Sequence, residues 1–287
     1  MSSDLPPPAS AVKISGLFIY PVKSCRGISL QHAQLGRRGL SRDREFLVID
    51  EADSFLTQRN APKLATIKTR VSDVALVLGA ASVGEFRLTL EPTSEPGRKS
   101  IQRRVKVFSD QVLADDMGND AAEWFSAALD RRCRLVRVGS SYSRRVNRDE
   151  SAISDKGEAP EISFTDAFPT LLTSESSLAE LNSRLPKAIP MERFRSNIVV
   201  RGAAPFEEDN WSCVSAGEIV FQPSAACLRC VITTTDQETG MRDGVEPLRT
   251  LGLYRRAPDG SGVMFGRYLV HSGMGTLHVG DLLSVVQ

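Results

Sequence analysis

Two cysteines spaced by two residues come directly before a run of β-branched side chains. The chain reads ACLRC over 226–230 and VITTT over 231–235. The second run predicts a strand, so Cys230 is expected where a loop enters that strand. Arg229 would stabilise a thiolate at Cys230, and the thiolate is the form of cysteine that binds soft metals or attacks electrophiles. Cys230 is therefore the first candidate for chemistry in this chain.

Three ordinary explanations compete for a Cys-x-x-Cys pair. Structural zinc needs four ligands, usually from a second closely spaced pair, whereas Cys25, Cys133 and Cys213 stand alone and the three histidines form no ligand motif. A thioredoxin-type dithiol lies at a helix N-terminus after a strand, but here a strand is predicted to follow the pair. Two inert buried cysteines remain the default explanation unless other residues indicate a site.

Basic residues recur beside small residues at the ends of predicted strands. The chain reads YPVKSCRG over 20–27, DR over 43–44, RFRSN over 193–197 and FGRY over 265–268. Guanidinium groups match phosphate oxygens in pairs, and glycine lets the backbone approach an anion closely. These segments favour an anion site, although each one alone could be a solvated surface group.

Composition excludes several classes of protein. The chain has 287 residues, 36 basic and 35 acidic side chains, 41% hydrophobic residues and 25% charged residues, as in ordinary soluble globular proteins. A net charge of +1 gives no general attraction to nucleic acid or membrane. No apolar run approaches the roughly 18–20 residues of a membrane span, and the first residues lack the features of a signal peptide. Five cysteines argue against a secreted disulfide framework, so a cytoplasmic location is expected.

Strand signals dominate the chain, with a few helices between them. The pattern predicts strands over 13–20, 45–50, 74–78, 86–90, 101–108, 133–138, 198–200, 219–222, 231–235, 266–270 and 282–286. It predicts helices over 120–129, over 177–185 with a capping box that opens at Ser177, and over 246–255 with Pro247 in the first turn. Together, these strands and helices predict a β-rich α+β protein that contains a barrel rather than a parallel sheet.

A long polar segment without periodicity divides the chain. We expect a disordered tail over 1–10, an N-terminal domain over 11–139, a surface loop over 140–160 and a C-terminal β-barrel domain over 161–287. The loop carries Arg144, Arg145 and Arg148, which would either receive an acidic partner or simply be solvated.

As a set, these segments resemble the MOSC family, the molybdenum-cofactor sulfurase C-terminal barrel proteins. The branch that matches is that of the mitochondrial amidoxime-reducing component and the bacterial reductases of N-hydroxylated bases. The resemblance extends over about 12–286. Its motifs are YPVKSCRG at 20–27, TQR at 57–59 followed by Pro62, LAELN at 178–182, FRSNI at 194–198, CLRC at 227–230, DQETG at 236–240 and GTLHVGD at 275–281.

The resemblance implies a MOSC-type β-barrel with an N-terminal MOSC-associated β-barrel or α-β module, and a molybdenum–molybdopterin cofactor. By this resemblance Cys230 would be the catalytic residue and the molybdenum ligand, and Cys227 would pack against the loop. The positions that would hold the pterin and its phosphate are Lys23, Ser24, Arg44, Arg195, Asn197, Arg229 and Tyr268. Leu228 departs from the serine that some relatives carry, and Asp166-Ala167-Phe168-Pro169 lacks their hydroxyl pair. Any contact at Ala167 or Phe168 is therefore expected from the backbone.

The implied activity is reduction of the N–O bond of hydroxylamines, amidoximes and N-hydroxylated bases. Asp166 would be a proton donor only if it pointed into the site, and a buried or turn-capping aspartate is the alternative. The Cys-x4-Cys-x2-Cys spacing of a plant-type iron–sulfur domain is absent from the sequence. We therefore expect a separate electron donor, such as a flavin reductase, a cytochrome b5-like protein or a ferredoxin-like protein.

Two other functions use the same residues. The protein could carry or mature the molybdenum cofactor, or carry sulfur as a persulfide on Cys230, without reductase turnover. Alternatively, the barrel could hold another phosphate ligand without any metal. Pyridoxal phosphate binding is a further expectation for this chain.

Overall fold

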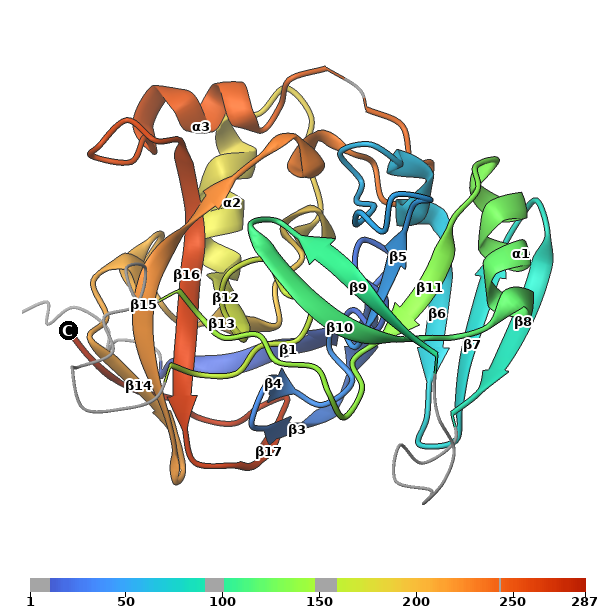
Figure 1. Cartoon of the computed structure of the whole chain (residues 1–287). Helices are drawn as coiled ribbons and strands as arrows, with labels where there is room; N and C mark the ends of the chain where they lie inside the picture. The colour runs from blue at the N-terminus through green and yellow to red at the C-terminus, as the bar shows by residue number, and fades with distance from the viewer. Residues whose placement is uncertain (1–10, 91–100, 148–158, 243) are drawn as a thin grey trace, which may run out of the picture.

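The computed structural model describes residues 11–90, 101–147, 159–242 and 244–287. Strands account for most of the regular structure of these residues, and they form four sheets. Figure 1 shows α1 (Asn119–Leu129) at one end of the molecule beside β8 (Gly84–Thr89), whereas α2 (Glu175–Arg184) and α3 (Leu248–Tyr254) lie next to each other and away from α1. The β-rich α+β fold predicted from the sequence is confirmed.

The largest sheet combines strands from both ends of the chain. Its order is β18-β14-β15-β16-β12-β13-β1-β2, and its pairs are antiparallel except for the parallel pair of β12 and β13. The strands are β1 (Lys13–Ile19), β2 (Ile28–Leu30), β12 (Thr170–Ser174), β13 (Ile198–Arg201), β14 (Cys213–Ala216), β15 (Ile219–Arg229), β16 (Val263–Ser272) and β18 (Ser284–Val286). The first two strands are thus built into a sheet whose other members all follow residue 169.

The three smaller sheets are antiparallel. One has the order β5-β11-β10-β9, another β17-β3-β4, and the third β6-β7-β8. Their strands are β3 (His32–Gly36), β4 (Gly39–Leu40), β5 (Phe46–Ile49), β6 (Lys68–Val71), β7 (Ala75–Ala80), β8 (Gly84–Thr89), β9 (Gln102–Val107), β10 (Asp110–Asp116), β11 (Arg134–Arg137) and β17 (Gly275–His278). Because β3 pairs with β17, a second sheet also joins the two ends of the chain.

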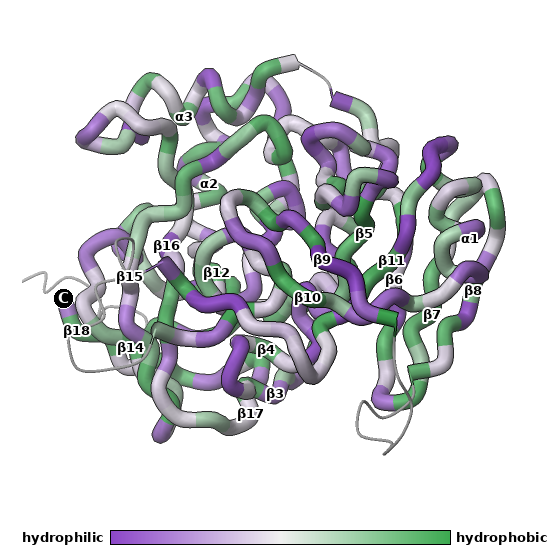
Figure 2. Tube along the Cα trace, in the orientation of Figure 1, coloured by the Kyte–Doolittle hydropathy of each residue, from purple (hydrophilic) through white to green (hydrophobic). Residues whose placement is uncertain are grey.

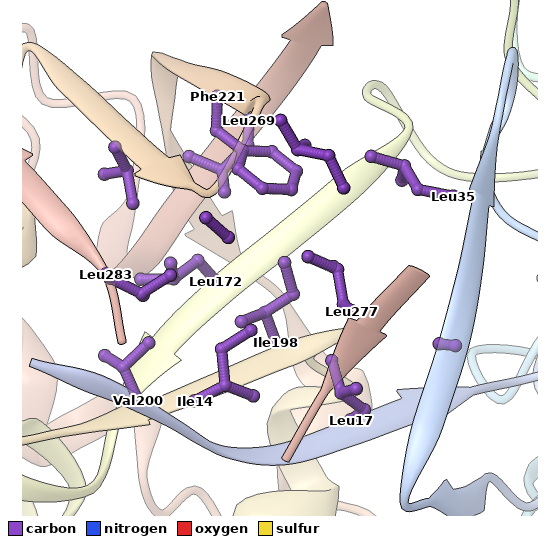
Figure 3. Close-up of a cluster of buried hydrophobic side chains, with 14 of the residues drawn as sticks. Ile14, Leu17, Leu35, Leu172, Ile198, Val200, Phe221, Leu269, Leu277 and Leu283 are labelled. Atoms are coloured by element: carbon purple, nitrogen blue, oxygen red, sulfur yellow. The ribbon is translucent and has the colours of Figure 1, made fainter. Parts of the chain in front are cut away.

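The pattern of apolar residues explains both continuously buried and alternating strands. Figure 2 shows β5 as hydrophobic along its length and β9 as largely hydrophilic. All four residues of β5 are buried, whereas β9 buries mainly Val105 and Val107. Figure 3 shows the main core, where side chains such as Leu17, Leu172 and Phe221 converge from different strands. Strands from both ends of the chain therefore share one hydrophobic core.

The predicted strand over 231–235 is wrong. Strand β15 ends at Arg229, and residues Val231–Thr234 form the 3₁₀ turn η5. The hydroxyl of Thr233 donates to the carbonyl of Cys230 at 3.0 Å, and the hydroxyl of Thr234 donates to the carbonyl of Val231 at 2.8 Å. Such local bonds from threonine to the backbone compete with strand formation. Cys230 therefore lies where a strand ends, not where one begins.

Two helix starts also differ from the prediction. Helix α2 begins at Glu175 after Ser174, so Ser177 is inside the helix and not its cap. The Ser177 hydroxyl instead donates to the buried carboxylate of Glu208 at 2.7 Å, because a buried carboxylate needs a donor. Helix α3 begins at Leu248, which leaves Pro247 as its N-cap.

The segment predicted as a polar loop over 140–160 is partly built into the protein. Arg144 is only 7% exposed, and its Nη1 donates to the carbonyl of Thr165 at 2.6 Å. Arg144 is therefore neither a solvated side chain nor a surface for an acidic partner. Arg148 and the predicted tail over 1–10 lie outside the described residues. No helix within the described residues is both long and apolar enough to cross a membrane.

Gly266 is a sensitive point of the largest sheet. Its φ is +81°, and a Cβ there would lie 2.6 Å from the carbonyl oxygen of Leu172 and 2.7 Å from Cγ2 of Thr173. Gly260 has a similar φ of +75° but open space around it. Both backbones disfavour alanine by roughly 1–2 kcal/mol. Only at Gly266 does steric overlap between β16 and β12 add to that value.

We predict that Gly266→Ala lowers the free energy of unfolding by about 1–3 kcal/mol more than Gly260→Ala. Urea denaturation of the two variants, followed by circular dichroism, measures the difference. Equal destabilisation by the two variants would contradict the close approach of β16 to β12.

Candidate functional site

One cavity brings together all eight residues that the sequence analysis singled out. Lys23 and Ser24 come from the connection between β1 and β2, Arg229 and Cys230 from the end of β15, and Tyr268 from β16. The other predicted residues in its lining are Arg44, Arg195 and Asn197. The cavity is also lined by Thr57, Arg59, Thr165, Asp166, Phe168, Leu171, Arg193, Phe194, Cys227, Leu228, Ile232 and Thr233. Segments from residue 23 to residue 268 therefore meet at one place.

Cys230 is partly exposed to this cavity and contacts a guanidinium group. Its backbone is extended, with φ −123° and ψ −179°, and Nη2 of Arg59 donates to its Sγ at 3.4 Å. Arg229, expected to stabilise the thiolate, instead donates to the carbonyls of Phe265 at 2.8 Å and Phe194 at 3.0 Å. The arginine in contact with the sulfur is thus Arg59, which the sequence analysis quoted only as part of a motif.

The two cysteines of the pair have different environments. Cys227 is 2% exposed, and burial raises the pKa of its thiol. Three residues of extended chain separate Cys227 and Cys230 by about 10 Å between Cα atoms, whereas a disulfide needs less than about 7 Å. Cys227 lies within β15, and a 3₁₀ turn instead of the predicted strand follows Cys230. The predicted strand therefore cannot be used to exclude a thioredoxin-type dithiol. The distance between the two cysteines in the extended chain excludes a disulfide instead.

Tyr20 holds two of the predicted arginines in place. The guanidinium carbons of Arg44 and Arg195 lie 4.2 Å and 4.3 Å from the centre of its ring. Stacking of this kind is favourable for both cations. Burial lowers the pKa of Arg195 to about 10, so Arg195 still carries its charge at neutral pH.

The backbone is left-handed at three of the lining residues. Ser24 has φ +70°, Arg44 φ +46° and Arg195 φ +55°. Non-glycine residues seldom adopt this conformation, and it concentrates at functional sites when the surrounding structure enforces it.

Three arginines of the lining carry buried N–H groups that have no hydrogen-bond partner among the described residues. They are Nε of Arg193, Nη2 of Arg195 and Nη2 of Arg229. A buried donor without an acceptor is costly, more so on a charged group. An anion with several oxygens, such as a phosphate group, would accept from such donors. These residues therefore fit the phosphate of a cofactor.

Lys23 and Asp166 form an ion pair in the cavity wall. The Nζ of Lys23 donates to Asp166 and, at 2.8 Å, to the carbonyl of Phe164. Burial lowers the pKa of Lys23 to about 8, and the Asp166 carboxylate opposes this shift. Burial also acts to raise the pKa of Asp166, but the ammonium of Lys23 outweighs it and holds that pKa well below its usual range. Asp166 therefore faces the cavity as a carboxylate and cannot donate a proton near neutral pH.

The side chain of Asn197, predicted to hold the cofactor, already uses its polar atoms in hydrogen bonds within the protein. The amide of Asn197 donates to the carbonyl of Phe18 at 3.1 Å and accepts from the backbone of Leu171 at 3.2 Å. Asn197 thus joins β1 to β12 at the cavity wall. Phe168, expected to contribute only backbone, stacks its ring on Tyr268 with 5.0 Å between centroids.

No group of three or more histidine, cysteine or acidic side chains in the described residues is arranged to hold a metal ion. Cys230 offers one thiol at the end of a strand. A metal bound here would bring most of its ligands with it, as a metal does in a dithiolene cofactor.

Comparison with known proteins places the chain in a family. Residues 11–132 match the MOSC N-terminal beta barrel domain, and residues 159–284 match the MOSC domain. Mitochondrial amidoxime-reducing component 1 of Mus musculus is 36% identical over 279 residues, which cover 93% of this chain and 80% of the mouse protein. Mitochondrial amidoxime reducing component 2 of Bos taurus is 35% identical over 279 residues, with 93% and 81% covered. The human component 1 is 33% identical over 280 residues, with the same coverage as the bovine protein.

These comparisons confirm the predicted family. Nothing in them supports the expected pyridoxal phosphate binding, which remains without any observation in its favour.

Sulfate affinity of the cofactor-free protein is predicted to fall above pH 8. Sulfate keeps its charge throughout this range, whereas Lys23, with its pKa of about 8, is protonated below that pH and neutral above it. The loss of one cation from the cavity weakens anion binding by roughly 3- to 10-fold between pH 7 and 9.5. Isothermal titration calorimetry measures the change.

The matched control is Lys23→Arg, because arginine stays charged throughout this range. Its sulfate affinity is expected to fall much less than that of the wild type from pH 7 to 9.5, because Arg195, with a pKa of about 10, loses only part of its charge there. The same fall in both proteins would show that Lys23 is not the group responsible.

Proposed function

The chain belongs to the MOSC family as a relative of the mitochondrial amidoxime-reducing components, and from this membership we propose that it reduces N-hydroxylated compounds with a molybdenum cofactor. Proteins named for amidoxime reduction match it over 93% of its length. The observation that carries the proposal is the thiol of Cys230 in a cavity with three unpaired guanidinium N–H groups. A sulfur ligand and an anion site are the two things that a molybdenum–pterin phosphate requires of a protein.

The chain's residues divide the task of holding this group. Cys230 would supply the metal's protein ligand, and Arg193, Arg195 and Arg229 would donate to the phosphate. Lys23 and Ser24, which also line the cavity, would help to hold the pterin. When bound, the cofactor supplies the two-electron chemistry that converts an N–OH group to N–H and water.

Conversion of N–OH to N–H and water consumes two protons as well as two electrons. Asp166 is ionised and cannot deliver them. The Nζ of Lys23 can hold a proton near neutral pH, because its pKa is about 8, and the Asp166 carboxylate keeps this ammonium at the cavity wall. Lys23 is thus the group in the cavity best suited to hold a proton during turnover.

The reduction needs a source of electrons, and the names of the relatives specify reduction but no reductant. We propose a separate electron-donor protein, of the flavin reductase, cytochrome b5-like or ferredoxin-like class. The substrate is a small N-hydroxylated compound, as the names of the relatives suggest.

The test is the molybdenum and pterin content of the protein purified from a cofactor-producing host, followed by assay with a chemical reductant and benzamidoxime. We predict near-stoichiometric cofactor and amidine formation in the wild type. Cys230→Ala is expected to lose the metal and turnover. Cys227 is buried and only 2% exposed, so Cys227→Ala is expected to keep the metal and turnover.

Each other outcome identifies a different function. Bound cofactor without turnover in the wild type favours a cofactor carrier or maturation protein. Absence of molybdenum from the wild type would refute the reductase and leave a barrel that holds another phosphate ligand.

A further inference from the structure

Two large apolar side chains are exposed on either side of Cys230. Leu228 is 45% exposed and Val231 is 37% exposed. Single exposed apolar residues are common on protein surfaces. These two, however, lie within two positions of Cys230 in the sequence, and Leu228 lines the cavity together with Ile232. Leu228 and Ile232, together with Val231 between Cys230 and Ile232 in the chain, are hereafter called the apolar rim.

Local structure explains why Leu228 stays exposed. It pairs with Met264 across the sheet at the end of β15, and beside it lies Gly262, where even an added Cβ would be no closer than 3.7 Å to the Leu228 side chain. Glycine provides no side chain to cover the leucine. The 3₁₀ turn η5 then carries the chain away directly after Cys230, so no following strand covers it either.

The rest of the lining has the opposite character. Arg59 contacts the sulfur of Cys230, and Lys23, Arg193 and Asp166 also line the cavity. Apolar surface beside a reaction centre with a few placed polar groups is typical of a site that binds an amphipathic small molecule. Contact with an apolar group is favourable there, whereas a charged group would lose hydration without gaining a partner.

We propose that the apolar rim binds the uncharged hydrocarbon body of the substrate, and that Leu228 sets the preference for aromatic over small N-hydroxylated compounds. This proposal rests on the proposed reductase function. The N–O group would lie toward Cys230 and Arg59, and the aryl or alkyl body over Leu228 and Val231. The preferred substrates are therefore neutral amidoximes or hydroxylamines with an aromatic or branched aliphatic group.

The first test uses the loaded enzyme and two amidoximes that differ only in their hydrocarbon body. In the wild type, kcat/KM is expected to be higher for benzamidoxime than for acetamidoxime. Leu228→Ser is expected to lower the ratio of the two values by roughly 3- to 10-fold, as for loss of a few methylene contacts, with molybdenum content unchanged. Leu113→Ser is the matched control, because Leu113 is 38% exposed on β10 and does not line the cavity. A ratio that Leu228→Ser leaves within twofold of the wild type would overturn the proposal.

The second test needs no turnover. In cofactor-free protein with Cys213→Ser, Cys230 is the only partly exposed cysteine, since Cys25, Cys133 and Cys227 are buried. The rates of its alkylation by N-phenylmaleimide and by N-methylmaleimide, each divided by the rate with glutathione, report the surroundings of the sulfur. We expect a preference for the phenyl reagent that Leu228→Ser lowers by about 3- to 10-fold and Leu113→Ser does not. Cys230→Ala gives the background.

The two tests separate the two proposals. If neither amidoxime is reduced but the maleimide preference depends on Leu228, the reductase function fails, and the apolar rim binds hydrocarbon groups beside Cys230 but not the body of an amidoxime substrate. If both amidoximes are reduced and neither ratio depends on Leu228, the reductase function stands and the apolar rim is not the substrate's binding surface.

Discussion

Burial of several cations around one cavity is the constraint on which the rest of the structure depends. A buried guanidinium loses its hydration and needs acceptors in return. Backbone carbonyls provide many of them: Arg195 donates to Cys25, Arg44 to Arg195, and Arg229 to Phe194 and Phe265. Each of these carbonyls must point toward the guanidinium group that it accepts from. At Arg195 the left-handed backbone accompanies such a contact, because its own carbonyl accepts from Arg44.

The sheet shared by the two ends of the chain brings these cations together. Strand β1 leads to Lys23 and Ser24, while β15 and β16 carry Arg229 and Tyr268. Pairing of β1 with β13 and the shared hydrophobic core hold these segments in register. Asn197 extends the same connection with side-chain bonds to both β1 and β12. The cavity is thus produced by the pairing of distant segments, and neither end of the chain contains it alone.

Residue types and motif order predicted much of the site, whereas contacts between segments were beyond the sequence. Strands such as β1 and β5 follow from apolar patterning, and helix α1 follows from its buried alanines and aromatics. The run at 231–235 was wrongly predicted as a strand. The hydroxyls of its threonines donate to backbone carbonyls three residues earlier, and these bonds favour a 3₁₀ turn over the strand that threonine otherwise prefers. Arg59 was overlooked as the partner of Cys230 since 171 positions separate them, and no local pattern reports such a distance. Ser177 resembled a helix cap because of the capping-box spacing that follows it. Its actual acceptor, Glu208, comes from another segment, and no local pattern reports that contact.

The bridge between Lys13 and Leu282 bears on when the cavity can form during protein synthesis. Translation adds roughly 5–20 residues per second, so these 287 residues take on the order of 15–60 s to synthesise. Strand β1 leaves the ribosome early and has to wait for β13, and Lys13 has to wait still longer for Leu282. Folds rich in such distant pairings also form slowly. Loading of any ligand into the completed cavity is therefore a step that follows translation.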